Sequence, residues 1–298
     1  MPTGSPVDGF RLAYDRHGTP TPGRPTVVLL HGWPGDRTDH ADVAARLAGT
    51  ADVLVPDLRG FGESDKHLRD PAEAYTATAQ ARSVAGLADE LGLSDLVVAG
   101  YDVGSRVAQT LGRDRPDLVR ALVVTPPAPG VGRRILSEDA MREFWYQPFH
   151  QLDLAEQLVD GNAEAARIYL RHFWTHWSGP DFTPDDARLD HLASVYGPEG
   201  AFVASIGWYR GGSGMVASSL AEQTPDPADR LAVPTTFLWP GHDSLFPREW
   251  SDRLGEFFTD VTVTPVDGVG HFVPVEAPDE FSRAVSAAAD LHSGAGGI

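Results

Sequence analysis

Short apolar runs that alternate with helix-like stretches constrain the fold of this chain more than any other feature. Each run is rich in β-branched residues and bounded by Gly or Pro, which is typical of strands buried on both faces. Such runs cover residues 26–31, 52–56, 96–101, 121–124, 234–239 and 261–264. Helical patterns occupy residues 39–47, 75–91, 103–112 and 278–291. This alternation predicts an α/β fold in which helices cover both faces of a parallel sheet.

A different pattern fills residues 133–227. Ser137 is a capping residue followed by two acids, and Pro184 stands at the first position of another helix-like stretch, so both predict helix starts. No convincing strand pattern occurs here. Four of the seven tryptophans do, namely Trp145, Trp174, Trp177 and Trp208. We therefore expect an aromatic-rich helical segment inserted into the α/β core.

Charge balance and residue content exclude several classes of protein. The 298 residues include 24 Lys and Arg against 42 Asp and Glu, a formal net charge of −18. A nucleic-acid partner needs a basic face, so this balance excludes one. The absence of cysteine excludes disulfides, thiolate catalysis and Cys-ligated metals. No apolar run approaches the ~20 residues of a membrane span, and no basic start precedes an apolar stretch. We therefore expect no membrane partner and a cytoplasmic location.

One strand-to-helix turn has the pattern of a nucleophile site. Gly100-Tyr-Asp102-Val-Gly104 joins the strand pattern at 96–101 to the helix pattern at 103–112. A sharp turn of this kind exposes the central side chain, and the flanking glycines let the chain segments pack closely around it. The central residue of such turns is usually Ser, and here it is Asp102. The turn is weak evidence alone, since any strand-to-helix turn can be rich in glycine.

Further motifs follow other predicted strands. His31-Gly-Trp33-Pro34-Gly35 comes after the first strand, where the backbone amides of Trp33 and Val103 would form an oxyanion hole. Asp243 and His271 each follow a later strand. Nucleophile, acid and base thus appear in the order Asp102, Asp243 and His271, each at the carboxyl end of a strand.

Taken together, these motifs resemble the α/β-hydrolase superfamily over nearly the whole chain. The resemblance rests on His31-Gly-Trp-Pro34, Asp57-Leu-Arg-Gly-Phe-Gly-Glu-Ser64, Gly100-Tyr-Asp-Val-Gly104 and Gly270-His-Phe272. It implies an α/β-hydrolase core with a mostly parallel sheet, formed by residues 1–132 and 228–298. It also implies a helical cap at residues 133–227, inserted after the sixth core strand.

An aspartate at the turn resembles the branch that contains epoxide hydrolases and dehalogenases. In that branch the carboxylate attacks carbon and forms an alkyl ester, and the histidine activates the water that hydrolyses it. Epoxide hydrolases use two cap tyrosines to protonate the leaving oxygen. Phe144-Trp-Tyr146-Gln147 and Trp208-Tyr209-Arg210 are similar to their tyrosine motifs.

Two dehalogenase groups fit less well. Haloalkane dehalogenases hold the halide with a Trp after the nucleophile and an Asn in the first motif, where this chain has Val103 and Trp33. Haloacetate dehalogenases clamp a carboxylate with an Arg directly after the nucleophile and another three residues later, and only the second is present, as Arg106. The aromatic run 172–177 keeps this second alternative open.

The resemblance therefore predicts an epoxide hydrolase that converts an epoxide and water to a vicinal diol without a cofactor. Asp102 would be the nucleophile, Tyr146 and Tyr209 the acids, and His271, oriented by Asp243, the base. The expected partner is a small apolar epoxide, and the sequence leaves a homodimer open. His172 and His176 have helical spacing but no third metal ligand, so we expect a place in the core or in the pocket lining and no metal. The residues expected to line the substrate pocket are Trp174, Trp177, His172 and Phe272. A ligand receptor without turnover is a less favoured alternative.

Overall fold

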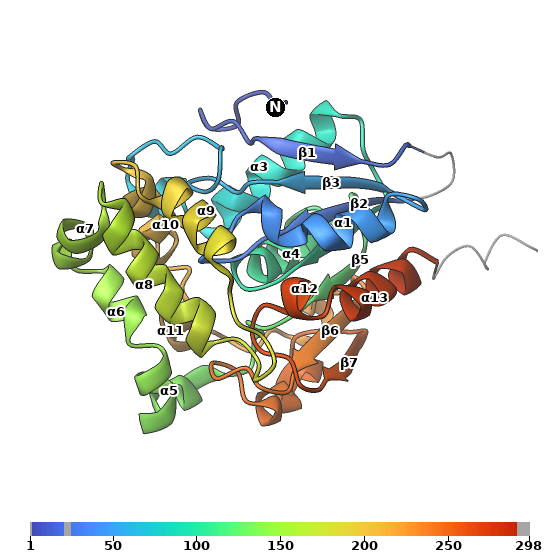
Figure 1. Cartoon of the computed structure of the whole chain (residues 1–298). Coiled ribbons are helices and arrows are strands. Elements are labelled where there is room, and N and C mark those ends of the chain that lie inside the picture. The colour runs from blue at the N-terminus through green and yellow to red at the C-terminus, as the bar shows by residue number, and fades with distance from the viewer. Residues whose placement is uncertain (1, 21–24, 291–298) are drawn as a thin grey trace, which may run out of the picture.

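A seven-stranded sheet forms the centre of the computed structural model, which describes residues 2–20 and 25–290 (Figure 1). The strand order is β1-β3-β2-β4-β5-β6-β7, and all neighbours pair in parallel except β1, which is antiparallel to β3. The strands are β1 (Tyr14–His17), β2 (Thr26–Leu30), β3 (Asp52–Pro56), β4 (Leu96–Gly100), β5 (Val119–Val124), β6 (Thr235–Pro240) and β7 (Val261–Val266). The predicted, mostly parallel α/β sheet is confirmed.

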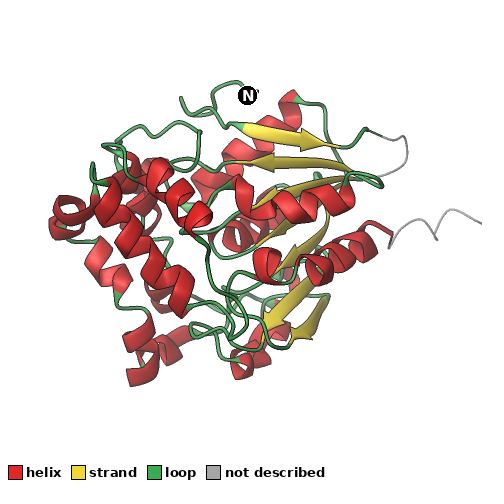
Figure 2. Cartoon of the chain, in the orientation of Figure 1, coloured by secondary structure: helices red, strands yellow, loops and turns green. Residues whose placement is uncertain are grey.

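Helices cover both faces of this sheet, as Figure 2 shows. Successive side chains of a strand point to opposite faces, so Val28 and Leu30 of β2 join one buried cluster and Val27 and Leu29 join another. The first cluster includes α3 (Ala77–Glu90) and α4 (Val103–Asp114), and the second includes α1 (Ala41–Leu47) and α13 (Pro278–Asp290). The shorter helices of the core are η1 (Arg37–His40), α2 (Pro71–Ala74), η3 (Pro227–Asp229), η4 (Arg248–Glu256) and α12 (Val273–Glu276). Leu291, the predicted last residue of the final helix, lies outside the described residues.

Residues 133–227, here called the cap segment, contain helices and no strand in the described chain. Its helices gather at the carboxyl ends of the central strands (Figure 1). They are η2 (Gly132–Leu136), α5 (Glu138–Glu143), α6 (Tyr146–His150), α7 (Asp153–Val159), α8 (Ala163–His176), α9 (Asp186–Tyr196), α10 (Ala201–Arg210) and α11 (Met215–Ala221). The cap segment follows the fifth described strand, whereas the resemblance implied the sixth. The difference arises because residues 3 and 7, ahead of β1, form only isolated bridges.

The cap segment is attached to the loop that precedes η1. The indole N–H of Trp174 donates to the carbonyl oxygen of Pro34 at 2.8 Å, and the hydroxyl of Tyr196 donates to that of Gly35 at 2.7 Å. An ion pair of 2.6 Å joins Arg188 of α9 to the buried Asp39. These contacts place α8 and α9 against the loop that carries Trp33.

Candidate active site

Asp102 occupies the turn between β4 and α4 in a strained conformation. Its φ is +49°, a region that residues other than glycine rarely adopt. The turn is tight because a Cβ atom on Gly104 would lie 2.1 Å from the carbonyl oxygen of Leu30. One on Gly100 would lie 2.7 Å from the backbone of Gly104. The two glycines therefore permit the close approach that holds Asp102 at the carboxyl end of the sheet.

The three residues predicted as nucleophile, base and acid lie together. Nδ1 of His271 is 2.8 Å from a carboxylate oxygen of Asp243, and its Nε2 is 3.3 Å from one of Asp102. The other oxygen of Asp243 accepts the backbone N–H of Leu245 at 2.9 Å, which orients the carboxylate. His271 is 1% exposed, and each carboxylate residue is 8% exposed.

Electrostatics favour a protonated His271 in the free protein. Burial opposes its charge, but the negative charge of Asp243 and the hydrogen bonds to both carboxylates outweigh burial and raise the pKa of His271 to about 10. The imidazolium is then paired with two carboxylates.

The structure shows a hydrogen bond to Asp102 from one of the two predicted oxyanion donors, Trp33. The backbone N–H of Trp33 donates to Oδ1 of Asp102 at 2.8 Å, and the oxygen it contacts would carry negative charge when a tetrahedral intermediate forms on this carboxyl group. Val103 begins α4 directly after Asp102, and its part as the second donor stays a prediction.

Tyr146 of α6 and Tyr209 of α10 line the same cavity as Asp102. Their rings lie 5.5 Å apart at 90°, and the side-chain amide of Gln147 donates to the Tyr146 hydroxyl at 3.1 Å. Burial raises the pKa of both phenols well above the usual range, and the negative charge of Asp102 adds to the rise. Both phenols therefore stay protonated in the free protein.

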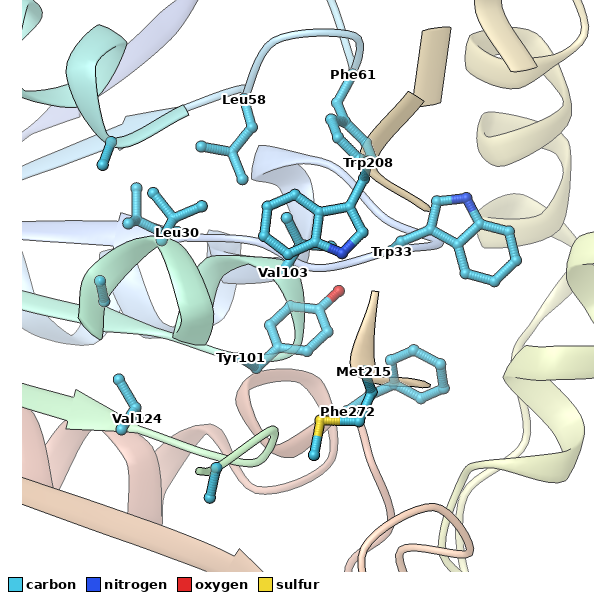
Figure 3. Close-up of a cluster of buried hydrophobic side chains, with 14 of the residues drawn as sticks. Leu30, Trp33, Leu58, Phe61, Tyr101, Val103, Val124, Trp208, Met215 and Phe272 are labelled. Atoms are coloured by element: carbon cyan, nitrogen blue, oxygen red, sulfur yellow. The ribbon is translucent and has the colours of Figure 1, made fainter. Parts of the chain in front are cut away.

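The cavity beside Asp102 is narrow in this structure. Its volume of about 10 Å³ leaves room for one water molecule. Figure 3 shows Val103 beside the indole of Trp208, and both residues line this cavity. The walls also include Arg106 of α4 and Met215 of α11. A substrate of ordinary size would have to displace parts of these walls.

None of the four residues predicted as pocket lining borders this cavity. The prediction for His172 is wrong, because this side chain is exposed and stacks on His176 at 5.6 Å. Helix phase is the reason: residues 172 and 176 lie on the outer face of α8, whereas 173, 174 and 177 lie on its buried face. Trp174 stacks on Phe272 at 3.8 Å, and Trp177 lies 5.2 Å from both the Tyr146 and His271 rings, so these three form the packing behind the site.

Three further residues of the site had no role assigned from the sequence. Gln147 orients the hydroxyl of its neighbour Tyr146, and Phe246 lines the cavity from the loop after β6. The hydroxyl of Tyr101 donates to the buried Asp39 at 2.6 Å, which ties the nucleophile turn to η1. Tyr101 and Asp39 lie far apart in the chain, so no local pattern identifies their contact.

Residues 2–20 and 25–290 contain no group of three or more His, Cys, Asp or Glu side chains that could hold a metal ion. Within the same residues, no helix is both long enough and apolar enough to span a membrane.

Comparisons with known proteins place this geometry in a family. The soluble epoxide hydrolase of Corynebacterium sp. (strain C12) is 29% identical over 91% of each chain, and the fluoroacetate dehalogenase of Burkholderia sp. is 33% identical over 87% of this chain and 85% of its own. The solved structure of the epoxide hydrolase CorEH without ligand has a TM-score of 0.80 at 26% identity, covering 94% of this chain and 95% of its own. Residues 25–278 match the model of the α/β-hydrolase fold family. The chain belongs to the α/β-hydrolase family.

Proposed function

We propose that this hydrolase opens epoxides with water to give vicinal diols. The observation that carries the proposal is the pair of buried, protonated phenols of Tyr146 and Tyr209 in one cavity with Asp102. An alkoxide leaving group is strongly basic, so ring opening needs a proton donor. A halide leaving group needs no proton.

The first half-reaction forms an ester. The Asp102 carboxylate attacks an oxirane carbon while a phenol of Tyr146 or Tyr209 protonates the ring oxygen, so a C–O bond forms to the carboxylate and the ring C–O bond breaks. The negative charge of Asp102 is lost in this step. His271 then has one anionic neighbour fewer, its pKa falls, and it releases its proton, which restores the phenol of the tyrosine that protonated the ring oxygen.

The second half-reaction hydrolyses the ester. His271, held by Asp243, takes a proton from water, and the resulting hydroxide attacks the carboxyl carbon. The backbone N–H of Trp33 contacts Oδ1 of Asp102 and would stabilise the oxyanion. Collapse of the intermediate releases the diol and restores the carboxylate, and no cofactor takes part in these steps.

Tyrosine variants test whether the two phenols donate protons or only pack against their neighbours. Tyr146→Phe and Tyr209→Phe should each slow epoxide opening, and together they should lower it by about 10²- to 10⁴-fold. Tyr75→Phe is a matched control, because its buried hydroxyl donates to the carbonyl of His67 outside the cavity. Wild-type turnover of styrene oxide by the folded double variant would contradict the proposal.

Isotope labelling tests the ester itself. With enzyme in excess over epoxide in water labelled with heavy oxygen, the first turnover should yield mainly unlabelled diol and leave the label in Asp102. The new hydroxyl oxygen comes from the carboxylate in this mechanism. Fully labelled diol in the first turnover would mean that water attacks the epoxide directly.

Haloacetate dehalogenation is the second candidate. It is favoured by Arg106 in the wall of the cavity and by the similarity to the Burkholderia fluoroacetate dehalogenase. Release of fluoride from fluoroacetate, with no diol from any epoxide, would select this candidate.

A further inference from the structure

Two buried carboxylates, Asp36 and Asp39, lie in the loop that follows β2 and at the start of η1. Asp36 is 1% exposed and Asp39 is 3% exposed. The same loop carries Trp33, whose backbone N–H donates to Asp102. Burial of a carboxylate is costly unless the group is paired and hydrogen-bonded. The position of this loop therefore depends on the partners of its two carboxylates.

Both ion pairs of these carboxylates come from the cap segment. Nε2 of His191 is 2.7 Å from Oδ2 of Asp36. The guanidinium of Arg188, one turn earlier in α9, donates to Oδ1 of Asp39 at 2.6 Å. In residues 2–20 and 25–290, neither carboxylate forms an ion pair with any other element. Helix α9 thus supplies the positive charge that two buried anions of the core require.

The contact of Arg188 continues to the nucleophile turn. The second oxygen of Asp39, Oδ2, accepts the hydroxyl of Tyr101 at 2.6 Å. Tyr101 is fully buried and directly precedes Asp102 in the turn between β4 and α4. Its ring also lies 6.3 Å from the ring of His271 at 77°. A chain of direct contacts therefore joins the cap segment to the residue beside the nucleophile.

The members of this chain have little room to move. A Cβ atom on Gly35 would overlap with both the Asp39 carboxylate and the Tyr101 hydroxyl. The guanidinium of Arg188 lies over the Trp174 ring, 4.5 Å from its centre. Burial raises the pKa of Asp39, and the positive charge of Arg188 opposes that rise. Without this cation the carboxylate would have to shift, take up a proton or admit water, and each change would disturb its bond to Tyr101.

We propose that Arg188 is a positioning residue for the nucleophile. Through Asp39 and Tyr101, it holds the turn at Asp102 in place while the cap segment rests on the core. Arg188 is not among the residues that line the cavity at Asp102, so it acts on the carboxylate and does not contact the epoxide. This inference rests on the proposed role of Asp102 as nucleophile, and it adds a link between the cap segment and the attack.

The rate of ester formation at saturating styrene oxide tests this role. Arg188→Met should lower that rate by about 10- to 100-fold in rapid-quench measurements, because a displacement of about 1 Å is enough for such a loss. Epoxide affinity should change by less than about threefold, since no substrate contact is removed. Arg188→Lys should restore part of the rate because it retains the positive charge.

A double-mutant cycle tests whether the effect passes through Tyr101. Tyr101→Phe removes only the hydroxyl that contacts Asp39, and it should also slow ester formation. Arg188→Met should then have little further effect in the Tyr101→Phe protein, because the contact through which it acts is already missing. Losses that multiply, as they do for independent sites, would overturn the inference.

Arg167→Met is the matched control. Arg167 of α8 is 23% exposed against 24% for Arg188, and its ion pairs with Asp186 and Asp190 remain within the cap segment. This variant should retain the wild-type rate of ester formation. An equal loss in Arg167→Met and Arg188→Met would overturn the inference, because a general loosening of α9 would explain both. If Arg188→Met does not fold, Arg188→Lys and the Tyr101→Phe protein decide the test.

The pKa of His271 keeps the two proposals separable. If no epoxide is converted, the proposed function fails, and NMR titration of the free protein then tests the position of Asp102 alone. Nε2 of His271 is 3.3 Å from Asp102, and this contact helps to raise the pKa of His271 to about 10, while Asp243 and Glu276 act on the same imidazole in every variant.

Displacement of Asp102 in Arg188→Met should lower the pKa of His271 to about 9 or below. Loss of the positive charge alone would have the opposite effect, because a distant cation disfavours the imidazolium. An unchanged or higher pKa in Arg188→Met would reject the positioning role whatever the reaction is.

Discussion

In the proposed reaction Asp102 loses its negative charge when the ester forms, and His271 then loses its proton. Substitutions at the two residues should therefore affect different half-reactions. In His271→Gln, Asp102 keeps its hydrogen bond from the Trp33 amide, so ester formation should continue while ester hydrolysis stops. Intact-protein mass spectrometry should then find one adduct, on the peptide that contains Asp102. The same substitution combined with Asp102→Asn should give none. Undiminished turnover in His271→Gln would contradict the assigned base.

The raised pKa of His271 predicts different pH profiles for the two half-reactions. In the free protein its pKa is about 10, above the ordinary 6.5, so between about pH 6 and pH 9 the imidazolium persists and ester formation should change little. Ester hydrolysis needs neutral His271, whose pKa falls once Asp102 is esterified, so its rate should decline at low pH. Rapid-quench measurements resolve the rates of the two steps. An equal decline of both rates at low pH would contradict this account.

Individual residues differ in how far sequence predicts them. Asp102, Asp243 and His271 follow predicted strands, and the carboxyl ends of parallel strands meet at one edge of a sheet, so their proximity follows from the pattern. The position of His172 does not follow from the sequence in this way. An aromatic run predicts a helix, but it does not show which face of that helix packs against the core. Arg106 was noted in the sequence, yet its place in the wall of the cavity at Asp102 emerges only from the packed structure.

Helix α4 contains two glycines whose substitution by alanine should affect stability differently. At one of them close packing dominates, and at the other helix propensity dominates. A Cβ atom at Gly104 would meet the Leu30 carbonyl oxygen at 2.1 Å, whereas one at Gly112 would meet a methyl group of Leu122 at 3.2 Å. Gly104→Ala should therefore cost about 3 kcal/mol or more of unfolding free energy, because backbone must shift. Gly112→Ala should stay within about 1 kcal/mol of the wild type, since improved helix propensity offsets a small displacement.

Urea unfolding at equilibrium measures both variants. Similar midpoints for Gly104→Ala and the wild type would mean that the turn at Asp102 relaxes more readily than its contacts indicate. The activity of a folded Gly104→Ala protein would then show whether a shift of the turn also displaces the Asp102 carboxylate.

Helices and strands could be predicted where most of their side chains are buried and apolar. Strands β2 to β5 read as apolar runs because they are covered on both faces. Strand β1 was not predicted, since Tyr14–His17 includes two charged residues at the sheet edge, and only its pairing with β3 defines it. The helix predicted at 75–91 corresponds to α3, which begins at Ala77 because the hydroxyl of Thr76 caps it.

At the scale of the whole molecule, the small volume of the cavity at Asp102 predicts movement of the cap segment. Binding sites for small molecules typically enclose about 300–1,000 Å³, far above the roughly 10 Å³ found here. The chain has no cysteine, so Leu158→Cys in α7 and Arg283→Cys in α13 create two unique, exposed positions for spin labels. Their distance distribution should change when His271→Gln traps the ester. An unchanged distribution would assign the opening to side chains alone.

The position of the cap segment between β5 and β6 has a consequence for rebuilding this protein. These strands are parallel neighbours, so the chain must return from the end of one to the start of the next. Over the six residues of β5 that journey is about 20 Å at roughly 3.3 Å per residue. The two ends of the cap segment lie close together, because Glu222 accepts the backbone N–H of Gly130, so the residues between the cap segment and β6 make that return. An insert of another size that keeps these residues should therefore leave the pairing of β5 with β6 intact.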